Sequence, residues 1–106
     1  MSLFRRRQRP RQRADDGAAR AETLAHLRNF TATRTGVEAY LEPVTAHDPH
    51  TVVLVAKDGE WTRRRVPGPA EARSLAHELG IPIYDVHLTG YPARMRRWSS
   101  AHRGRR

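Results

Sequence analysis

The chain has no cysteine among its 106 residues, and only one of its 20 basic residues, Lys57, is a lysine. The absence of cysteine excludes disulfides, thiolate metal sites and redox chemistry through sulfur. The excess of arginine favours bidentate phosphate contacts and base stacking over simple point-charge attraction. A GC-rich coding bias would also enrich arginine, but it would not explain where along the chain the arginines lie.

Long apolar runs and glycine-rich loops are missing too. No stretch approaches the roughly 18 apolar residues of a membrane-spanning helix. The basic start is not followed by the apolar run of about 7 to 15 residues that a secretory signal needs. The seven glycines are scattered and match neither GxGxxG nor GxxxxGK. We therefore expect a cytoplasmic protein with no membrane span and no cofactor.

Acidic residues are absent from the first thirteen and the last thirteen positions, which together hold 12 of the 20 basic residues. The net charge of +9 therefore divides into +6 at each end and −3 between them. These end residues are Arg5, Arg6, Arg7, Arg9, Arg11, Arg13, Arg94, Arg96, Arg97, Arg103, Arg105 and Arg106. Two cationic ends on a mildly acidic unit indicate a polyanionic partner.

The composition divides the chain into three parts. Residues 1–17 are rich in arginine and glutamine and are interrupted by Pro10, which predicts a disordered basic arm. Residues 18–92 have the length and patterning of a single small domain. Residues 93–106 form a second basic segment, expected to be a flexible tail.

Within the domain the patterns predict an α+β fold with element order αβββαβ. Helices are predicted at 18–33 and 69–79, and strands at 37–42, 51–56, 60–66 and 81–88. We expect a mainly antiparallel sheet of three or four strands, with the two helices on one face. The run 51–56 is apolar on both faces and is expected at the centre. Pro82 suggests an edge for the last strand, which could run parallel to the third.

Trp61-Thr62-Arg63-Arg64-Arg65 is one candidate nucleic-acid-binding feature. On a strand, Trp61, Arg63 and Arg65 project from one face, where an indole could stack a base while guanidiniums hold phosphates. In the alternative, Trp61 packs in the core and the arginines form a solvated edge that pairs with nearby glutamates.

The segment YPARMRRW (residues 91–98) also mixes aromatic and basic residues. Arg94, Arg96, Arg97 and Trp98 would suit nucleic acid or an acidic protein groove. In the alternative, Tyr91 and Trp98 fold back over the edge of the sheet and the arginines remain solvated.

Catalytic and metal-binding patterns are weak. His47, Asp48 and His50 offer three metal ligands in a loop, but a zinc site needs four ligands on a rigid frame. Asp85 and His87 could form an acid–base pair, yet no nucleophile motif such as GxSxG accompanies them. We therefore expect neither a metal site nor an enzyme.

Two resemblances extend over much of the chain. The start MSLFRRR, the hairpin DGEWTRRRV and the ending GIPIYDV…GYPARMR resemble those of a group of small basic actinobacterial proteins of unknown function. The order of the first five elements is similar to that of double-stranded-RNA-binding domains. That family places basic residues at the start of its last helix, where this chain has Pro69, Ala70, Glu71 and Ala72, and only Arg73 is basic.

The sequence therefore predicts a non-enzymatic nucleic-acid-binding protein, associated with structured RNA or the ribosome through its arginine-rich ends. A second hypothesis is a protein–protein adaptor that docks its basic C-terminal tail on an acidic partner of the transcription or translation machinery. A third is peripheral membrane association through Leu3 and Phe4, although two apolar residues make a small anchor.

Overall fold

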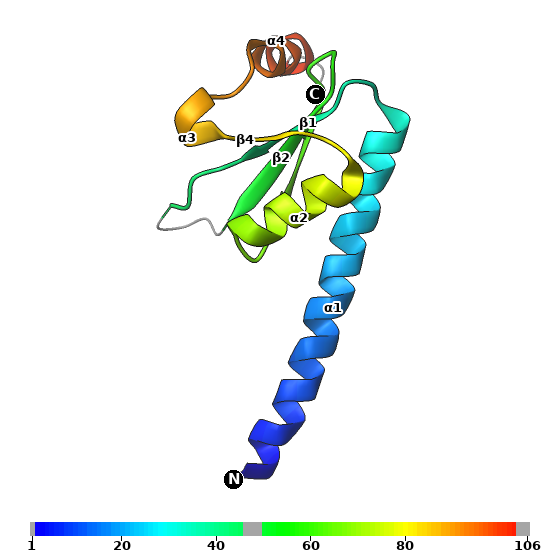
Figure 1. The fold of residues 1–106 in the computed structure, drawn as a ribbon, viewed down its shortest axis with the longest axis vertical. Helices are drawn as coiled ribbons and strands as arrows, with labels where there is room; N and C mark the ends of the chain where they lie inside the picture. The colour runs from blue at the N-terminus through cyan, green and yellow to red at the C-terminus, as the bar shows by residue number, and fades with distance from the viewer. Residues whose placement is uncertain (1, 46–49, 104–106) are drawn as a thin grey trace.

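The structure is a computed structural model that describes residues 2–45 and 50–103, with side chains described from residue 17 onward in those ranges. A four-stranded sheet carries helices on both faces (Figure 1). The elements are α1 (Ser2–Thr33), β1 (Glu38–Leu41), β2 (Thr51–Val55), β3 (Trp61–Arg65), α2 (Pro69–Leu79), β4 (Ile83–Asp85), α3 (Val86–Thr89) and α4 (Ala93–His102). The predicted α+β class is confirmed.

The strands lie in the order β3-β2-β1-β4. β2 pairs with β1 and β3 in antiparallel fashion, whereas β4 runs parallel to β1, so the sheet is mixed. The central position of β2 and the edge position of β4 agree with the sequence. The predicted pairing of the last strand with the third is wrong, because α2 carries the chain across the sheet to its opposite edge.

The last strand is shorter than predicted. It ends at Asp85, and residues 86–89 form α3 instead of continuing the strand. The Asp85 carboxylate accepts a hydrogen bond of 2.8 Å from the backbone N–H of His87, which caps the first turn of α3. Aspartate is among the preferred residues for this capping position. The capping hydrogen bond of Asp85 therefore outweighs the alternating apolar pattern from which a strand is predicted over 81–88.

Both chain ends differ from the flexible segments that the sequence predicts. α1 begins at Ser2 and runs as one helix away from the sheet, through the residues expected to be a disordered arm (Figure 1). Arginine and glutamine are good helix formers, and the sequence interpretation gave more weight to charge and to Pro10. At the other end, Ala93–His102 is helical, and residues 104–106 lie outside the described residues.

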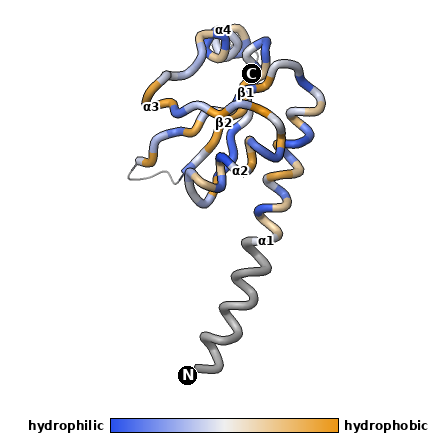
Figure 2. Tube along the Cα trace, in the orientation of Figure 1, coloured by the Kyte–Doolittle hydropathy of each residue, from blue (hydrophilic) through white to orange (hydrophobic). Residues whose placement is uncertain are grey.

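The main core lies between α1, α2 and one face of the sheet. Leu27 and Phe30 from α1 meet Leu75 from α2 over Val52 and Leu54 of β2. All five side chains are buried, and Leu24 and Leu79 pack at the border of the cluster. The helices predicted at 18–33 and 69–79 are therefore confirmed as parts of α1 and α2. Figure 2 shows hydrophobic segments gathered around the sheet.

A second, smaller core lies on the other face of the sheet, under α4. It contains Tyr40, Val53, Val55 and Met95, with Trp61 packed against it. The prediction that the two helices at 18–33 and 69–79 lie on one face is therefore confirmed, whereas α4, which the sequence analysis expected to be a flexible tail, covers the other face. β2 carries apolar side chains on both faces of the sheet. The face opposite α1 and α2 must therefore also be buried, and α4 buries it.

We expect Leu75→Ala to destabilise the fold by about 2–5 kcal/mol, because Leu75 is buried between α2 and the sheet and its truncation leaves a cavity. Leu88→Ala is a matched control, since Leu88 is 81% exposed and its truncation should change stability by less than about 0.5 kcal/mol. Urea denaturation monitored by circular dichroism measures both. Equal midpoints for the two variants would contradict the packing of α2.

Candidate nucleic-acid interface

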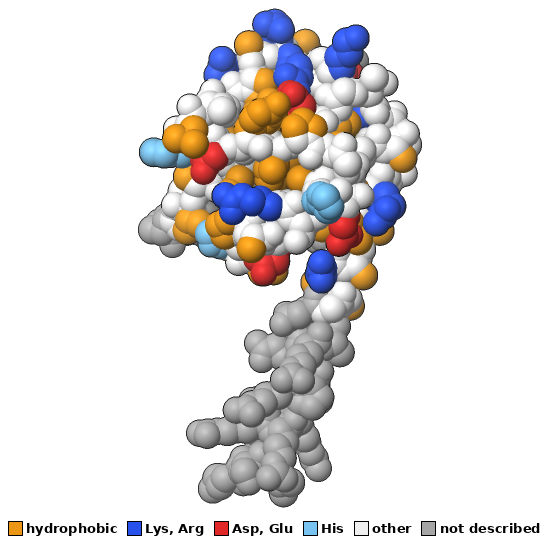
Figure 3. Space-filling model, viewed as in Figure 1, with side chains coloured by type: hydrophobic (Ala, Val, Ile, Leu, Met, Phe, Trp, Pro, Cys, Tyr) orange, Lys and Arg blue, Asp and Glu red, His pale blue; other side chains and the backbone are white. Residues whose placement is uncertain are grey.

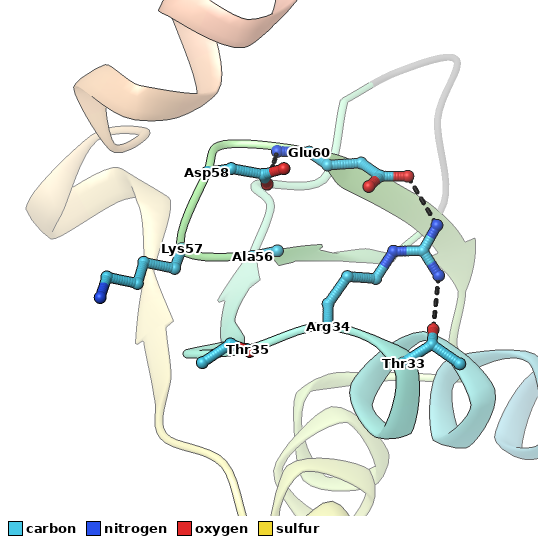
Figure 4. Close-up of a pocket in the computed structure, with 7 residues that line it drawn as sticks. All are labelled: Thr33, Arg34, Thr35, Ala56, Lys57, Asp58 and Glu60. Atoms are coloured by element: carbon cyan, nitrogen blue, oxygen red, sulfur yellow. Dashed lines mark hydrogen bonds and ion pairs between the residues drawn. The ribbon is translucent and has the colours of Figure 1, made fainter.

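A surface depression of about 830 Å³ lies where the end of α1 meets the β2–β3 hairpin (Figure 4). Arg34 reaches across it to the Glu60 carboxylate at 2.6 Å and donates to the hydroxyl of Thr33 at 2.7 Å. Lys57 points away from this pair, and Asp58 caps the turn by accepting from the backbone N–H of Glu60. The walls carry both signs of charge and neutralise one another, so this depression is a poor anion site.

The opposite end of β1 holds a buried carboxylate. Glu42 is 8% exposed and receives two hydrogen bonds from Arg63, of 2.6 and 2.8 Å. The hydroxyls of Thr51 and Tyr91 donate to the same carboxylate. One negative charge therefore accepts hydrogen bonds from β2, from β3 and from the segment before α4. Because the Arg63 pair is bidentate, the guanidinium is held in one orientation.

A second arginine–carboxylate pair fixes α4. Arg94 donates to the Glu38 carboxylate at 2.6 Å and to the backbone carbonyl of Ala56 at 2.9 Å. Tyr40 and Tyr84 donate their hydroxyls to Glu38 as well. Glu38 lies two pleats from Glu42 along the chain, so both carboxylates project from the face that α4 covers.

Both carboxylates titrate below their usual range. Burial disfavours the charged form of Glu42, but the hydrogen bonds from Arg63, Tyr91 and Thr51 more than offset it and lower the pKa. The pKa of Glu38 is lowered in the same way, since its hydrogen bonds from Arg94 and Tyr40 outweigh the effect of burial. The two groups therefore stay ionised over the whole neutral range.

Trp61 is a packing residue in this structure. Its ring lies against the second core, and its indole N–H donates to the Ser99 hydroxyl at 2.8 Å. Arg63 lies over the ring with its guanidinium carbon 5.2 Å from the centroid. The two sequence features that we singled out, β3 and residues 91–98, therefore meet on one face, and the arrangement matches the alternative in which Trp61 packs.

Gly59 shows how closely α4 approaches the hairpin. A Cβ at this position would collide with the backbone carbonyl of Arg94 and would lie 2.9 Å from Cβ of Trp98. Gly59 also has a φ of +99°, which residues with side chains disfavour. The glycine of the Asp58-Gly59 turn therefore serves both the turn and the packing of α4.

The remaining sequence-predicted residues lie as follows. Arg65, Arg96 and Arg97 are exposed and have no carboxylate partner among the described residues. Trp98 is partly buried and stacks on His102 at 3.9 Å between ring centroids. Arg63 and Arg94 are occupied by Glu42 and Glu38. The structure does not describe the side chains of the six predicted N-terminal arginines, Arg5, Arg6, Arg7, Arg9, Arg11 and Arg13.

The other chemical candidates are separated or used structurally. Asp85 caps α3 through the backbone of His87 rather than facing its ring. His47 and Asp48 lie outside the described residues. In the ranges that the structure describes, no three metal-ligating side chains gather. No helix among the described residues is long and apolar enough to cross a membrane.

The sequence interpretation missed the roles of Glu38 and Glu42. It considered them only among the nearby glutamates that could pair with the arginines of residues 61–65. Their spacing with Tyr40, every second residue along this segment, is the signal that could have placed all three on one covered face.

The comparisons with known proteins add no name. No family model matches the chain, and neither a curated protein nor a solved structure matches it. The two resemblances noted in the sequence therefore stay predictions.

The lowered pKa values of Glu38 and Glu42 predict a loss of stability in acid. Their contribution is complete above the usual carboxyl pKa of 4.5 and disappears as the pH falls below that value through the folded-state pKa. Glu42→Gln should lower stability at pH 6 and weaken the pH dependence below 4.5. Glu71→Gln, at an exposed carboxylate on α2, should keep the wild-type dependence. Identical urea midpoint profiles for the two variants from pH 6 to pH 3 would contradict a special role of Glu42.

The bond between Trp61 and Ser99 predicts a second measurable effect. Ser99→Ala leaves the half-buried indole N–H without its acceptor and should cost about 0.5–1.5 kcal/mol. Ser100→Ala, at the exposed neighbouring serine, is the control and should be nearly neutral. Thermal unfolding followed by tryptophan fluorescence in a Trp98→Phe background measures both through Trp61 alone. A Ser99→Ala midpoint equal to that of Ser100→Ala would mean that the bond contributes nothing.

Proposed function

We propose that this protein binds structured RNA, such as that of the ribosome, and catalyses no reaction. The arginines of its two ends neutralise phosphates, and the folded domain holds one of these ends in place. The observation that carries the proposal is the separation of charge on α4. This helix contains no acid, its Arg94 is used inside the fold, and Arg96 and Arg97 face outward without a carboxylate partner in the described part of the chain.

The pairing inside the domain supports the same proposal. Glu38, Glu42, Glu60 and Glu78 each have an arginine partner from another element of the fold. These carboxylates are therefore not free to neutralise the outward arginines. Figure 3 shows basic side chains over α4 at the top of the molecule. A surface of unpaired guanidiniums attracts phosphate, since guanidinium and phosphate form bidentate hydrogen bonds.

The N-terminal segment supplies further arginines for phosphate binding. Six of the residues from 5 to 13 are arginines, and the backbone of this segment continues α1 away from the sheet. The sequence of residues 5–13 contains only arginine, glutamine and one proline, so this segment offers a charged partner many guanidiniums. Phosphate neutralisation of this kind gives affinity with little sequence preference.

We expect RNA affinity to fall steeply with salt. Six to ten phosphate contacts lower the association constant by roughly 10³ to 10⁵ between about 50 and 200 mM salt, because binding releases counterions. Fluorescence anisotropy with a labelled RNA hairpin measures the slope. Replacing Arg5, Arg6, Arg7 and Arg9 with glutamine should reduce the slope by about 0.9 for each phosphate that the variant no longer neutralises on a duplex. A flat salt response of the wild-type protein would refute an electrostatic role for the ends.

An adaptor that docks on an acidic protein would use the same arginines, and nuclease treatment separates the two functions. If RNA is the partner, ribonuclease treatment of the lysate should remove the molecules that co-purify with the protein. An acidic protein that stays bound after this treatment would favour the adaptor and contradict the proposal.

A further inference from the structure

The surface between β3 and α4 gathers arginines from two elements. The register pairs Trp61 with Val55, Arg63 with Val53 and Arg65 with Thr51. Val53 and Val55 belong to the core under α4, so Arg63 and Arg65 lie on the side of the sheet that α4 covers. The strand therefore brings two guanidiniums to this face.

Helix α4, which covers this face, contributes further arginines. Ser99 marks the flank of α4 that touches β3, because its hydroxyl accepts the indole N–H of Trp61. Arg96 lies three residues before Ser99 and Arg103 four residues after it, and residues at these spacings share one flank of a helix. Arg103 ends α4 with helical backbone angles, and both arginines are exposed.

The charge of this surface is not cancelled locally. β3 and α4 contain no acidic residue. The two carboxylates that β1 and the residue after it place on this face, Glu38 and Glu42, are held by Arg94 and Arg63. Arg65, Arg96 and Arg103 have no ion pair within the described ranges. Arg65 on β3, together with Arg96 and Arg103 on and just after α4, defines what we name the β3–α4 surface.

The surface is held rigidly and has the size of a short stretch of nucleic acid. α4 is fixed by Met95 in the core, by the Arg94–Glu38 pair and by Ser99. Arg65 lies four residues from Trp61, or roughly 13 Å along the strand. Arg96 and Arg103 are seven residues apart, or roughly 10 Å along the helix. A strand of B-form DNA advances by about 3.4 Å per nucleotide, and by that measure these lengths correspond to about three or four nucleotides.

Trp61 is not available to stack a base. Its ring packs on the core, its N–H is bonded to Ser99, and Arg63 lies over the ring. Without an open aromatic platform, a single strand gains little from unstacking its bases on this surface. Phosphates are the part of the RNA that the surface can hold, and an RNA helix presents them in a regular row.

We infer that the β3–α4 surface binds the phosphate backbone of double-helical RNA through Arg65, Arg96 and Arg103. This inference rests on the proposed RNA-binding function and narrows it to a defined surface and to one form of RNA. The N-terminal arginines add affinity, whereas the β3–α4 surface orients the domain on the helix.

Anisotropy titrations with full-length protein test the inference, using a 16-base-pair RNA duplex and a single strand with the same number of phosphates. The triple variant Arg65→Gln, Arg96→Gln, Arg103→Gln should bind the duplex at least about tenfold more weakly at 100 mM salt. Its salt slope should fall by about 2 to 3 because each phosphate contact contributes about 0.9. The matched control replaces Lys57, Arg28 and Arg73 with glutamine. These side chains are exposed and lie outside the surface, so this variant should bind about threefold more weakly or less.

The outcomes separate the surface from the function. Equal weakening in the two triple variants, with a steep wild-type salt slope, would overturn the β3–α4 surface and leave RNA binding by the ends intact. No salt-dependent binding of the wild type would refute the proposed function itself. A wild-type preference for the single strand would overturn the duplex assignment. Urea midpoints of both triple variants should match the wild type, since all six side chains are exposed, and this check confirms that any weaker binding does not come from unfolding.

Discussion

A buried negative charge at the end of β1 determines how the second half of the molecule is arranged. A carboxylate out of water is costly unless it is paired and hydrogen-bonded, and Glu42 meets this need with Arg63, Thr51 and Tyr91. Two of these donors come from neighbouring strands, and Tyr91 comes from the segment that leads into α4. The position of α4 over the sheet therefore depends on satisfying a charge at the end of β1.

The same pairing divides the arginines of the chain into two groups. Those that reach a glutamate of the fold, such as Arg63 and Arg94, hold strands and helices together. Others on β3 and α4, such as Arg65 and Arg96, have no such partner among the described residues, and they remain available to an external anion. One residue type thus serves both the architecture and the proposed binding, and only the nearby carboxylates distinguish the two uses.

Local patterns in the sequence predicted the elements that depend on near neighbours. The apolar spacing on α2, the doubly apolar β2 and the shared face of Trp61 and Arg63 are all present in the structure. Two of the predictions that were wrong depend on distant contacts. The partner of β4 is set by a crossover, and the docking of α4 joins Arg94 to Glu38, 56 residues apart. Charge composition alone also cannot tell a paired arginine from a free one, which is why Arg63 and Arg94 stood among the candidate binding residues.

α4 packs on β1, β2 and β3 together, and this requirement implies an order in which the parts of the chain fold. The β2–β3 hairpin closes a short loop, whereas seating α4 needs contacts with all three strands and with the turn at Gly59. Because closing long loops costs more conformational entropy, we expect α4 to join a sheet that is already formed. The β3–α4 surface therefore exists only in molecules in which α4 has docked. A partly folded chain has the same net charge but lacks this surface.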